Sequence, residues 1–235
     1  PRASPLRYLT RHELVTDEVG GVPVAVTFCP LCKSRIPFDR RVAGRVLSFG
    51  VSGKLRNSDM VMYDRETESW WQQAVGKGIV GELTGVELTQ MPTWMESWAE
   101  FKARNPEGLV MDQPGWPRQY GANPYVNYDS SRKPFLYNGE MPPHGVPALA
   151  RVVRVGDKVW TVERVRKEGE VTEAGVTISW ASGQASALDA RNINKGKDVG
   201  TIRVRDANGN DVPHDVMFAF AFHAFFPKGD WMLGS

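Results

Sequence analysis

Hydrophobic positions recur at every second residue in several short segments of this chain, which is the period of strands with one buried face. In residues 22–28 the alternating apolar positions are Val24, Val26 and Phe28. Residues 60–63 form a further short apolar run next to turn-forming and charged residues. The pattern therefore predicts a mainly β protein of the α+β class, built from many short strands.

Two segments show the helical period instead. Leucines recur at this spacing in residues 5–17, which also contain His12. In residues 93–104 aromatic side chains share one helical face, and Thr93 followed by Glu96 forms the capping-box pattern with which helices begin. We expect a short helix in each segment and few helices elsewhere.

Within residues 212–223, every position from Val216 to Phe222 is apolar. Central strands that are buried on both faces have this pattern, so we predict a central strand here. The segment carries two of the four histidines of the chain, His214 and His223.

Three regions of different composition follow one another along the chain. Residues 111–147 contain many Pro, Gly, Asn and Tyr residues with little periodicity, which predicts a long loop. The flanking residues 1–110 and 148–235 are both rich in strand patterns. We expect two degenerate copies of one β-rich unit, connected by this loop.

A weak internal alignment supports the duplication. Residues 161–172 lie over residues 5–16, and Val176 to Asp189 lies over Val26 to Asp39. In this alignment the second copy lacks a histidine and two cysteines of the first copy, three residues that could ligate a metal ion together. Their joint absence is expected if they form one site that only the first copy kept. At the positions of His12, Cys29 and Cys32 the second copy has Glu168, Ser179 and Ser182.

The composition is that of an ordinary globular protein, with 41% hydrophobic and 24% charged residues among 235. The 29 basic and 27 acidic residues are interleaved and give a formal net charge of +2, without the basic stripe of a nucleic-acid-binding protein. No apolar run approaches the roughly 18 residues of a membrane span. We therefore expect no nucleic acid and no membrane span, and the sequence specifies neither a protein partner nor a small ligand.

The predicted strand at 22–28 leads into Cys29-Pro30-Leu31-Cys32, which contains the only two cysteines of the chain. Two thiols three residues apart can share a metal ion, form a disulfide or perform redox chemistry. Proline directly after the first cysteine suits a metal-binding turn that aims both sulfur atoms at one point. In a thioredoxin-type site proline precedes the second cysteine and a helix follows, whereas Pro37 disfavours a helix here.

The sequence therefore predicts a transition-metal site, for copper or zinc, that is held by Cys29, Cys32 and His12. Met60, His214 and His223 are the candidate additional ligands. Two other functions stay open. One is a thiol–disulfide protein that cycles the cysteine pair, and the other is a ligand-binding module in which the pair is only structural.

An acidic cluster surrounds the predicted strand at 60–63, and we interpret it as a solvent-exposed turn. Its members are Asp59, Asp64, Glu66 and Glu68. No Ser/His/Asp spacing and no pair of carboxylates stands out as a catalytic arrangement, so the sequence assigns no reaction and leaves open whether the protein is an enzyme.

One set of motifs extends over essentially the whole chain. It comprises His12-Glu13-Leu14-Val15, Gly20-Gly21-Val22-Pro23-Val24, Cys29-Pro30-Leu31-Cys32, Phe49-Gly50-Val51-Ser52-Gly53, Leu55-Arg56-Asn57-Ser58-Asp59, Thr67-Glu68-Ser69-Trp70-Trp71-Gln72 and Tyr120-Gly121-Ala122-Asn123-Pro124-Tyr125. Together these motifs resemble the domain-of-unknown-function family 3179 of bacteria and archaea. Its members commonly carry secretion or lipoprotein signals, so the resemblance implies an extracytoplasmic location, periplasmic or membrane-anchored through a preceding segment. It implies no particular reaction.

Overall fold

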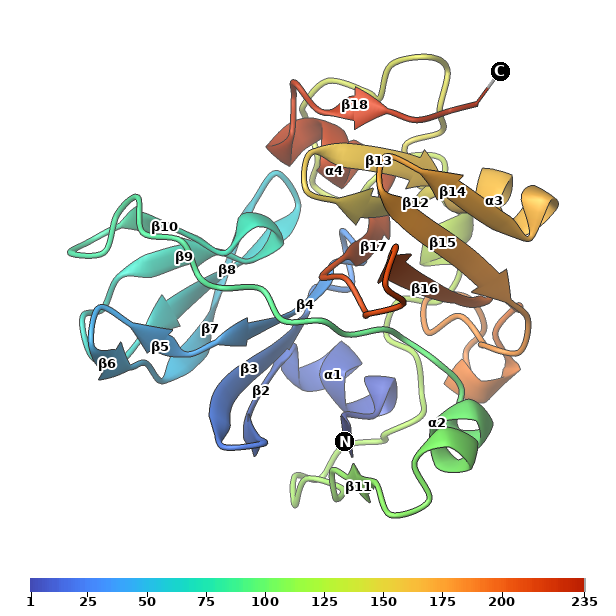
Figure 1. Cartoon of the computed structure of the whole chain (residues 1–235). Coiled ribbons are helices and arrows are strands. Elements are labelled where there is room, and N and C mark those ends of the chain that lie inside the picture. The colour runs from blue at the N-terminus through green and yellow to red at the C-terminus, as the bar shows by residue number, and fades with distance from the viewer. Residues whose placement is uncertain (235) are drawn as a thin grey trace.

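The strands of this protein form several small sheets, and the helices are few and short (Figure 1). The structure is a computed structural model that describes residues 1–234. In Figure 1 the first half of the chain, coloured blue to cyan, lies to the left of the second half, coloured yellow to red. The predicted mainly β, α+β class is therefore confirmed.

The first sheet contains the strand that leads to the cysteines. Helix α1 (Leu6–His12) precedes a hairpin of β2 (Leu14–Val19) and β3 (Val22–Phe28), and β4 (Arg35–Asp39) pairs antiparallel with the other edge of β3. Gly20 and Gly21 both have positive φ, which the two-residue hairpin turn between β2 and β3 requires. The Cys29–Cys32 turn therefore connects two paired strands, and each of its ends is fixed by the sheet.

A four-stranded antiparallel sheet, in the order β10-β9-β8-β7, contacts the first sheet through β7 and β2. Its strands are β7 (Phe49–Arg56), β8 (Asp59–Asp64), β9 (Trp70–Gln72) and β10 (Lys77–Val80). The short strands β5 (Arg41–Val42) and β6 (Arg45–Val46) precede it, and the 3-10 turn η1 (Gln73–Val75) follows β9. Asn57 and Ser58, both with positive φ, turn the chain so that Asp59 begins β8.

The second half of the chain contains two further sheets. One has the order β17-β12-β13-β18, with β12 (Arg151–Val155), β13 (Lys158–Thr161), β17 (Asp215–Phe218) and β18 (Asp230–Trp231). The other consists of β14 (Glu170–Glu173), β15 (Val176–Ala181) and β16 (Thr201–Asp206). Helix α3 (Val162–Glu168) contacts both sheets.

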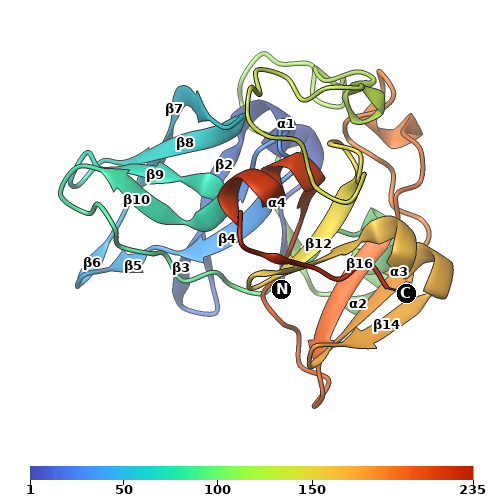
Figure 2. The ribbon, with the colours of Figure 1, turned by 90° about the horizontal axis from the view of Figure 1, so that it is seen from above.

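The prediction of a central strand over 212–223 is wrong in its second part. Strand β17 ends at Phe218, and helix α4 (Ala219–Phe225) follows directly. A short apolar run fits a buried strand and a buried helix equally well, so its periodicity could not separate them. Figure 2 shows α4 between the two halves of the molecule, where Phe220 and Phe222 are fully buried.

The helix predicted over 93–104 begins one turn later than expected. Helix α2 (Trp98–Arg104) has Ser97 as its N-cap and Glu100 at the capping-box position, with both reciprocal hydrogen bonds present. The predicted capping pair and the observed one have the same spacing, and the carboxylate of Glu96 instead pairs with Arg104. The observed helix therefore uses the second of two overlapping start signals.

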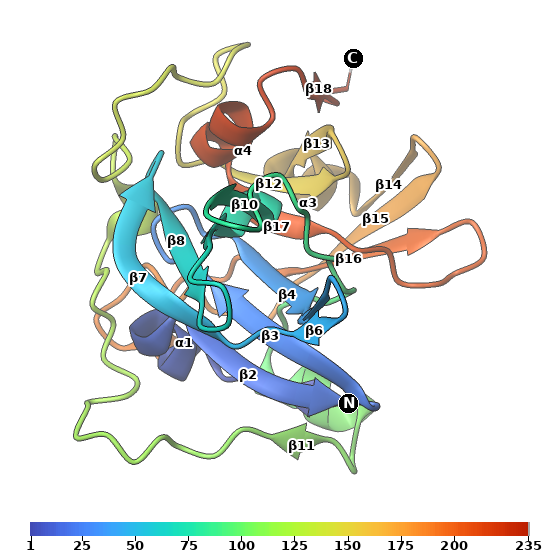
Figure 3. The same cartoon turned by 90° about the vertical axis from the view of Figure 1, so that its left-hand side faces the viewer.

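The long segment 111–147 has little regular structure and lies on the outside of the fold. Strand β11 (Leu109–Val110), just before it, pairs in parallel with β1 (Arg2–Ala3). The segment itself contains the 3-10 turn η2 (Tyr128–Ser130), and a further such turn, η3 (Ile193–Lys195), occurs in the second half. In Figure 3 the segment, coloured green to yellow, passes along the edge of the molecule beside α1 and β7.

Both halves contain a helix followed by three antiparallel strands, α1–β2–β3–β4 and α3–β14–β15–β16. The pairing registers differ from the internal alignment: Val15 faces Val26, whereas Val171 faces Ile178. The internal alignment puts Ser179 at the position of Cys29 and so predicts the same turn there, but this is wrong, because Ser179 lies inside β15. The duplication and its boundaries stay predictions, and Ser235 of the predicted second copy lies outside the described residues.

The larger hydrophobic core is shared by both halves. Met60 and Trp71 of the first half pack in one cluster with Phe218 and Phe220 of the second. The backbone also connects the halves, because the N–H of Phe218 donates to the carbonyl of Cys32 at 2.8 Å. The Cys29–Cys32 turn therefore lies at the junction of the two halves, whereas a smaller core lies entirely in the second half.

Candidate metal centre

Three side chains that can ligate a metal meet where β3 ends. The sulfur atoms of Cys29 and Cys32 and a carboxylate oxygen of Asp59 all lie within 4.8 Å of one another. The exposed fractions of these residues are 1%, 0% and 0%, and both cysteines are free thiols. The turn between β3 and β4 thus brings the cysteine pair together, and the start of β8 adds a carboxylate.

The two oxygens of Asp59 have different surroundings. Oδ1 accepts a hydrogen bond from the Cys32 thiol at 2.8 Å. Oδ2 accepts from Gln72 Nε2 at 2.5 Å and from the Ala74 N–H at 2.9 Å. The carboxylate is therefore oriented on one side by β9 and η1, and it presents its other oxygen to sulfur.

Asp59 was missed as a candidate ligand by the sequence analysis. The interpretation of the acidic cluster as a solvent-exposed turn is wrong for Asp59 and Asp64, both of which are completely buried. They are the first and last residues of β8, which pairs with β7 on one edge and β9 on the other. The available signal was an acidic residue directly before four apolar positions, in a motif that carries the family resemblance.

Burial controls the protonation of this site. Desolvation raises the pKa of Asp59 to about 6, although its hydrogen bonds act in the opposite direction. Desolvation also raises the pKa of Cys29 and brings that of Cys32 well above its usual value. Without a cation the two thiols therefore keep their protons at neutral pH, and a bound metal ion would have to displace them.

Glu13 is a fourth acidic group near the centre, and the sequence analysis did not single it out as a ligand. It ends helix α1 with a φ of 60°, a left-handed conformation that is unfavourable for a residue other than glycine. Burial, followed by the charge of Asp59, raises its pKa to about 7. Its place in the motif after His12 was the only sequence signal for it.

His12 contacts the long segment instead of joining this three-residue group. Its Nε2 lies 2.6 Å from the hydroxyl of Tyr120, and Nη2 of the neighbouring Arg11 donates to the carbonyl of Ala122 at 2.9 Å. In this structure the end of α1 therefore anchors the segment 111–147.

The two additional candidate histidines also lie outside this group. Met60 packs in the shared core, in the same cluster of buried side chains as both cysteines. His214 donates from Nδ1 to the carbonyl of Val212 at 2.9 Å, and its Nε2 faces Arg35 Nη2 at 3.3 Å. His223 Nε2 lies 3.7 Å from the carboxylate of Glu140.

Part of the long segment covers the centre. The hydroxyl of Tyr128 donates to the carbonyl of Leu31 at 2.8 Å and accepts from the N–H of Phe135 at 3.2 Å. Ser58 Oγ donates to the carbonyl of Phe135 at 2.5 Å. Tyr125 and Tyr128 also pack against the core cluster that contains both cysteines. Burial, followed by the charges of Glu13 and Cys29, raises the pKa of Tyr125 to about 12. We call residues 120–137 the covering segment.

The fold and the site define a mainly β protein that buries a Cys-x-x-Cys pair and an aspartate beneath a tyrosine-bearing segment. Residues 1–229 match the model of the family described as "Protein of unknown function (DUF3179)", and the chain belongs to this family. No curated protein and no solved structure matches it. Across residues 1–234, none of the helices has the length and apolar character needed to cross a membrane.

Proposed function

We propose that this protein binds a transition metal ion through Cys29, Cys32 and Asp59. The observation that carries the proposal is the meeting of three ligand atoms within 4.8 Å of one another in a buried site. Two thiolates and a carboxylate cannot be buried together as anions without a compensating charge. A divalent cation supplies that charge and replaces the protons that otherwise neutralise the site.

The ligand set favours zinc over copper. Zinc is held by cysteine sulfur at about 2.3 Å and by carboxylate oxygen at about 2.0–2.2 Å, which separates neighbouring ligand atoms by roughly 3.5 Å. The observed spacing fits this arrangement if the 2.8 Å contact of Cys32 with Asp59 widens when its proton is lost. Copper(I) prefers sulfur ligands, so a buried carboxylate in the set is a reason to choose zinc.

Two residues are candidates for a fourth ligand. His12, expected from the sequence, would have to exchange its hydrogen bond to Tyr120 for the metal. The charge of Glu13 raises the pKa of Cys29, and the charge of Asp59 raises the pKa of Glu13, so Glu13 interacts electrostatically with two of the proposed ligands. Comparing zinc affinity in His12→Ala and Glu13→Gln separates these candidates, because only loss of a ligand weakens binding strongly.

The test of the proposed function is the zinc content of protein that has been loaded with the metal and then dialysed. We expect one zinc ion per chain in the wild type and none when both cysteines are replaced by serine. Ile178→Val is the control, because Ile178 is buried in the smaller core of the second half and its replacement should leave zinc content unchanged. A wild type that retains no zinc, or a double variant that retains as much as the wild type, would contradict the proposal.

One observation favours thiol–disulfide chemistry as a second candidate function. The Cys32 thiol donates to a buried carboxyl group whose pKa is about 6, and such a group can accept the thiol proton when the thiolate forms. The burial of both sulfur atoms and the covering segment restrict access by a partner thiol. Mass spectrometry after alkylation distinguishes the two: a stable disulfide in native, metal-competent protein would favour the redox function.

We also propose, from the family resemblance, that the site functions outside the cytoplasm. In an oxidising compartment two adjacent free thiols tend to form a disulfide. A bound metal ion would protect the pair, which is consistent with the metal-binding function. Fractionation of cells that express the complete gene tests the location, and recovery of the protein in the cytoplasmic fraction would contradict it.

A further inference from the structure

Two adjacent apolar side chains of the covering segment are exposed to solvent. Phe135 and Leu136 have exposed fractions of 55% and 66%, whereas Pro134 before them and Tyr137 after them are buried. In Figure 3 the segment 111–147, which carries them, passes along the outer edge of the molecule. Isolated exposed apolar residues are common on proteins, but two neighbours that both forgo burial indicate a surface with a partner.

The backbone fixes this apolar pair on both sides. The N–H of Phe135 donates to the Tyr128 hydroxyl at 3.2 Å, and the carbonyl of Phe135 accepts from Ser58 Oγ at 2.5 Å. After the pair, the ring of Tyr137 packs against that of Phe220, with the ring centroids 4.8 Å apart. The fold therefore presents the two apolar side chains outward on an anchored stretch of chain.

The backbone of Leu136 is also in an unfavourable conformation. Its φ of 52° lies in the left-handed region, which residues other than glycine and asparagine rarely adopt. Neither burial nor backbone preference accounts for a leucine at this position. Residues held in this region are concentrated at sites that bind a ligand or partner, which supports a binding role for the pair.

Two basic side chains come directly before the apolar pair in sequence. Arg132 and Lys133 are both exposed. Neither forms an ion pair within residues 1–234, and the nearest carboxylate along the chain, that of Asp129, pairs with Arg151 and Lys197 instead. Both positive charges are therefore available to a partner outside the chain.

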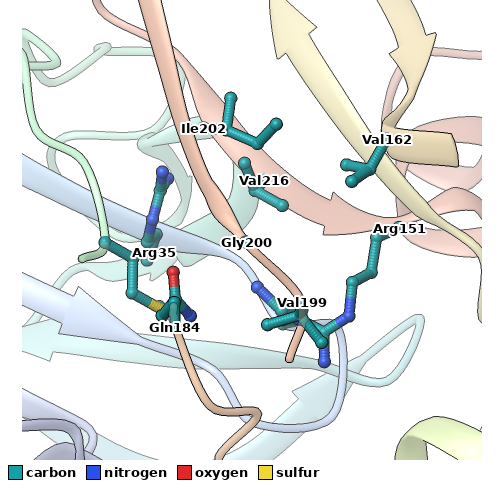
Figure 4. Close-up of a pocket in the computed structure, with 10 residues that line it drawn as sticks. Arg35, Arg151, Val162, Gln184, Val199, Gly200, Ile202 and Val216 are labelled. Atoms are coloured by element: carbon teal, nitrogen blue, oxygen red, sulfur yellow. The ribbon is translucent and has the colours of Figure 1, made fainter. Parts of the chain in front are cut away.

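Buried arginines of this protein differ in this respect. Figure 4 shows Arg35 and Arg151 at the walls of a small interior cavity. Arg35 lies 3.7 Å from a carboxylate oxygen of Asp215, and Arg151 lies 2.7 Å from one of Asp129. The arginines of that cavity are neutralised within the chain, whereas the exposed basic residues 132–133 are not.

We propose that residues 132–136 dock onto a membrane surface that carries anionic lipids. Phe135 and Leu136 insert among the lipid headgroups, and Arg132 and Lys133 lie against the lipid phosphates. Apolar side chains that enter the headgroup region, flanked by basic side chains, are the combination by which peripheral proteins bind such surfaces. At the outer edge of the molecule both kinds of side chain can reach a flat surface together. This inference does not depend on metal binding.

Cosedimentation with lipid vesicles tests the electrostatic part of the proposal. The wild type should bind vesicles of phosphatidylcholine with about 30% phosphatidylglycerol, and should bind pure phosphatidylcholine at least about 10-fold more weakly. Arg132→Gln/Lys133→Gln should weaken binding to the anionic vesicles by about 25-fold, or roughly five-fold for each charge. The matched control is Lys102→Gln/Lys228→Gln, which removes the same charge from exposed positions elsewhere and should bind nearly as tightly as the wild type.

The double variant Phe135→Ser/Leu136→Asn tests the insertion of the apolar pair. Both side chains are exposed and asparagine tolerates the left-handed backbone, so we expect a folded protein. Binding to the anionic vesicles should fall by about 10-fold or more, because two apolar side chains no longer leave water. The control Val80→Ser removes an exposed apolar side chain of β10 and should keep the binding of the wild type.

Vesicles with brominated acyl chains measure insertion directly, because bromine quenches tryptophan fluorescence at short range. Quenching should exceed that of the wild type in Phe135→Trp but not in Val80→Trp, and equal quenching of the two variants would overturn the proposal. A wild type that does not bind the anionic vesicles would also overturn it and would indicate a protein partner for this surface. Double variants that bind as tightly as their controls would overturn it as well.

Discussion

Asp59 connects the cysteine pair to the rest of the protein. One of its oxygens faces Cys32, and the other is fixed by Gln72 and the backbone of Ala74. A ligand that is oriented in this way loses little freedom when a metal binds, and residues that orient ligands contribute substantially to affinity. The chemistry of the centre therefore depends on Asp59, Gln72 and Ala74 as well as on the cysteines.

The substitution Asp59→Asn tests the ligand role directly. The asparagine carbonyl can still accept from Gln72 and Ala74, so we expect a folded protein. Its amide nitrogen then faces Cys32 and does not ligate zinc. We expect zinc affinity to fall by more than the roughly 10–100-fold that is typical of changes around a ligand. Titration against a competing chelator measures this change, and an affinity close to that of the wild type would exclude Asp59 as a ligand.

The substitution Gln72→Leu tests the orienting contact. It removes the donor to Asp59 Oδ2 while nearly preserving side-chain volume, and it leaves the three proposed ligands in place. We expect zinc affinity to fall by about 10–100-fold, with one zinc ion still bound per chain at saturation. The same chelator competition measures the effect, and its absence would show that Ala74 alone is enough to orient the carboxylate.

At the residue scale the sequence predicts the cysteines but not their partner. Cys29 and Cys32 are recognisable because their spacing along the chain implies proximity in space. Asp59 reaches them only through the hairpin turn at Asn57 and Ser58 and the packing of β8 between two strands. The same acidic residue next to a strand would face solvent in most settings, so local pattern alone could not identify it.

The covering segment is the element that separates the centre from solvent. Tyr128 connects the turn of the cysteines, through Leu31, to Phe135, and Ser58 also donates to Phe135. The first residue of the segment, Tyr120, has its hydroxyl within hydrogen-bond distance of His12 Nε2. The segment thus contacts three separate parts of the first half of the chain, and its position controls access to the sulfur atoms.

Replacing Tyr128 by Phe should loosen this cover. The change removes one hydroxyl and two hydrogen bonds while retaining the ring, so the thiols of the zinc-free protein should react about 10-fold faster with a thiol reagent, as expected for loss of roughly 1–1.5 kcal/mol of contact energy. Tyr137→Phe is the matched control, because its hydroxyl donates to Glu140 and not to the cysteine turn. Equal reaction rates in the two variants would show that the covering segment does not control access.

At the element scale the strand at 22–28 and the apolar run at 60–63 could be predicted, because alternation and turn residues are local signals. The change from β17 to α4 could not, since Phe218 and Ala219 lie in one continuous apolar run. The position of the covering segment is also inaccessible to pattern analysis. It depends on hydrogen bonds between residues that are distant in sequence, such as Tyr128 and Leu31.

At the scale of the whole molecule, the two halves meet at a buried polar junction as well as at a shared core. The carboxylate of Asp215 accepts hydrogen bonds from the Ser34 hydroxyl and from the backbone N–H of Arg35. The Arg35 guanidinium also lies 3.3 Å from Nε2 of His214. Of these groups, Ser34 and Arg35 follow the cysteine turn directly in sequence. The stability of the complete fold and the geometry of the candidate centre are therefore expected to be coupled.

His214 gives a prediction for the pH dependence of stability. Burial, followed by the charge of Arg35, lowers its pKa from 6.5 to about 3. Between these values the unfolded chain binds a proton that the folded protein does not. The contribution to stability is therefore complete above pH 6.5 and is lost as the pH falls. At pH 5 we expect a loss of about 2 kcal/mol from this residue.

Urea unfolding of zinc-free protein at neutral pH and at pH 5 measures this loss. The raised pKa values of Asp59 and Glu13 act in the opposite direction, because the folded state holds their protons more tightly. The informative quantity is therefore the difference between the wild type and His214→Gln. The wild type should lose about 2 kcal/mol more on acidification than the variant, and identical losses would contradict a neutral, buried His214.

The most direct test of the metal centre is X-ray absorption at the zinc edge of the loaded wild-type protein. The account predicts two sulfur neighbours at about 2.3 Å together with oxygen or nitrogen neighbours at about 2.0–2.2 Å. In Asp59→Asn any zinc that still binds should keep the two sulfur neighbours and lose one light-atom neighbour. A zinc ion with one sulfur neighbour or none in the wild type would contradict a centre formed by Cys29, Cys32 and Asp59.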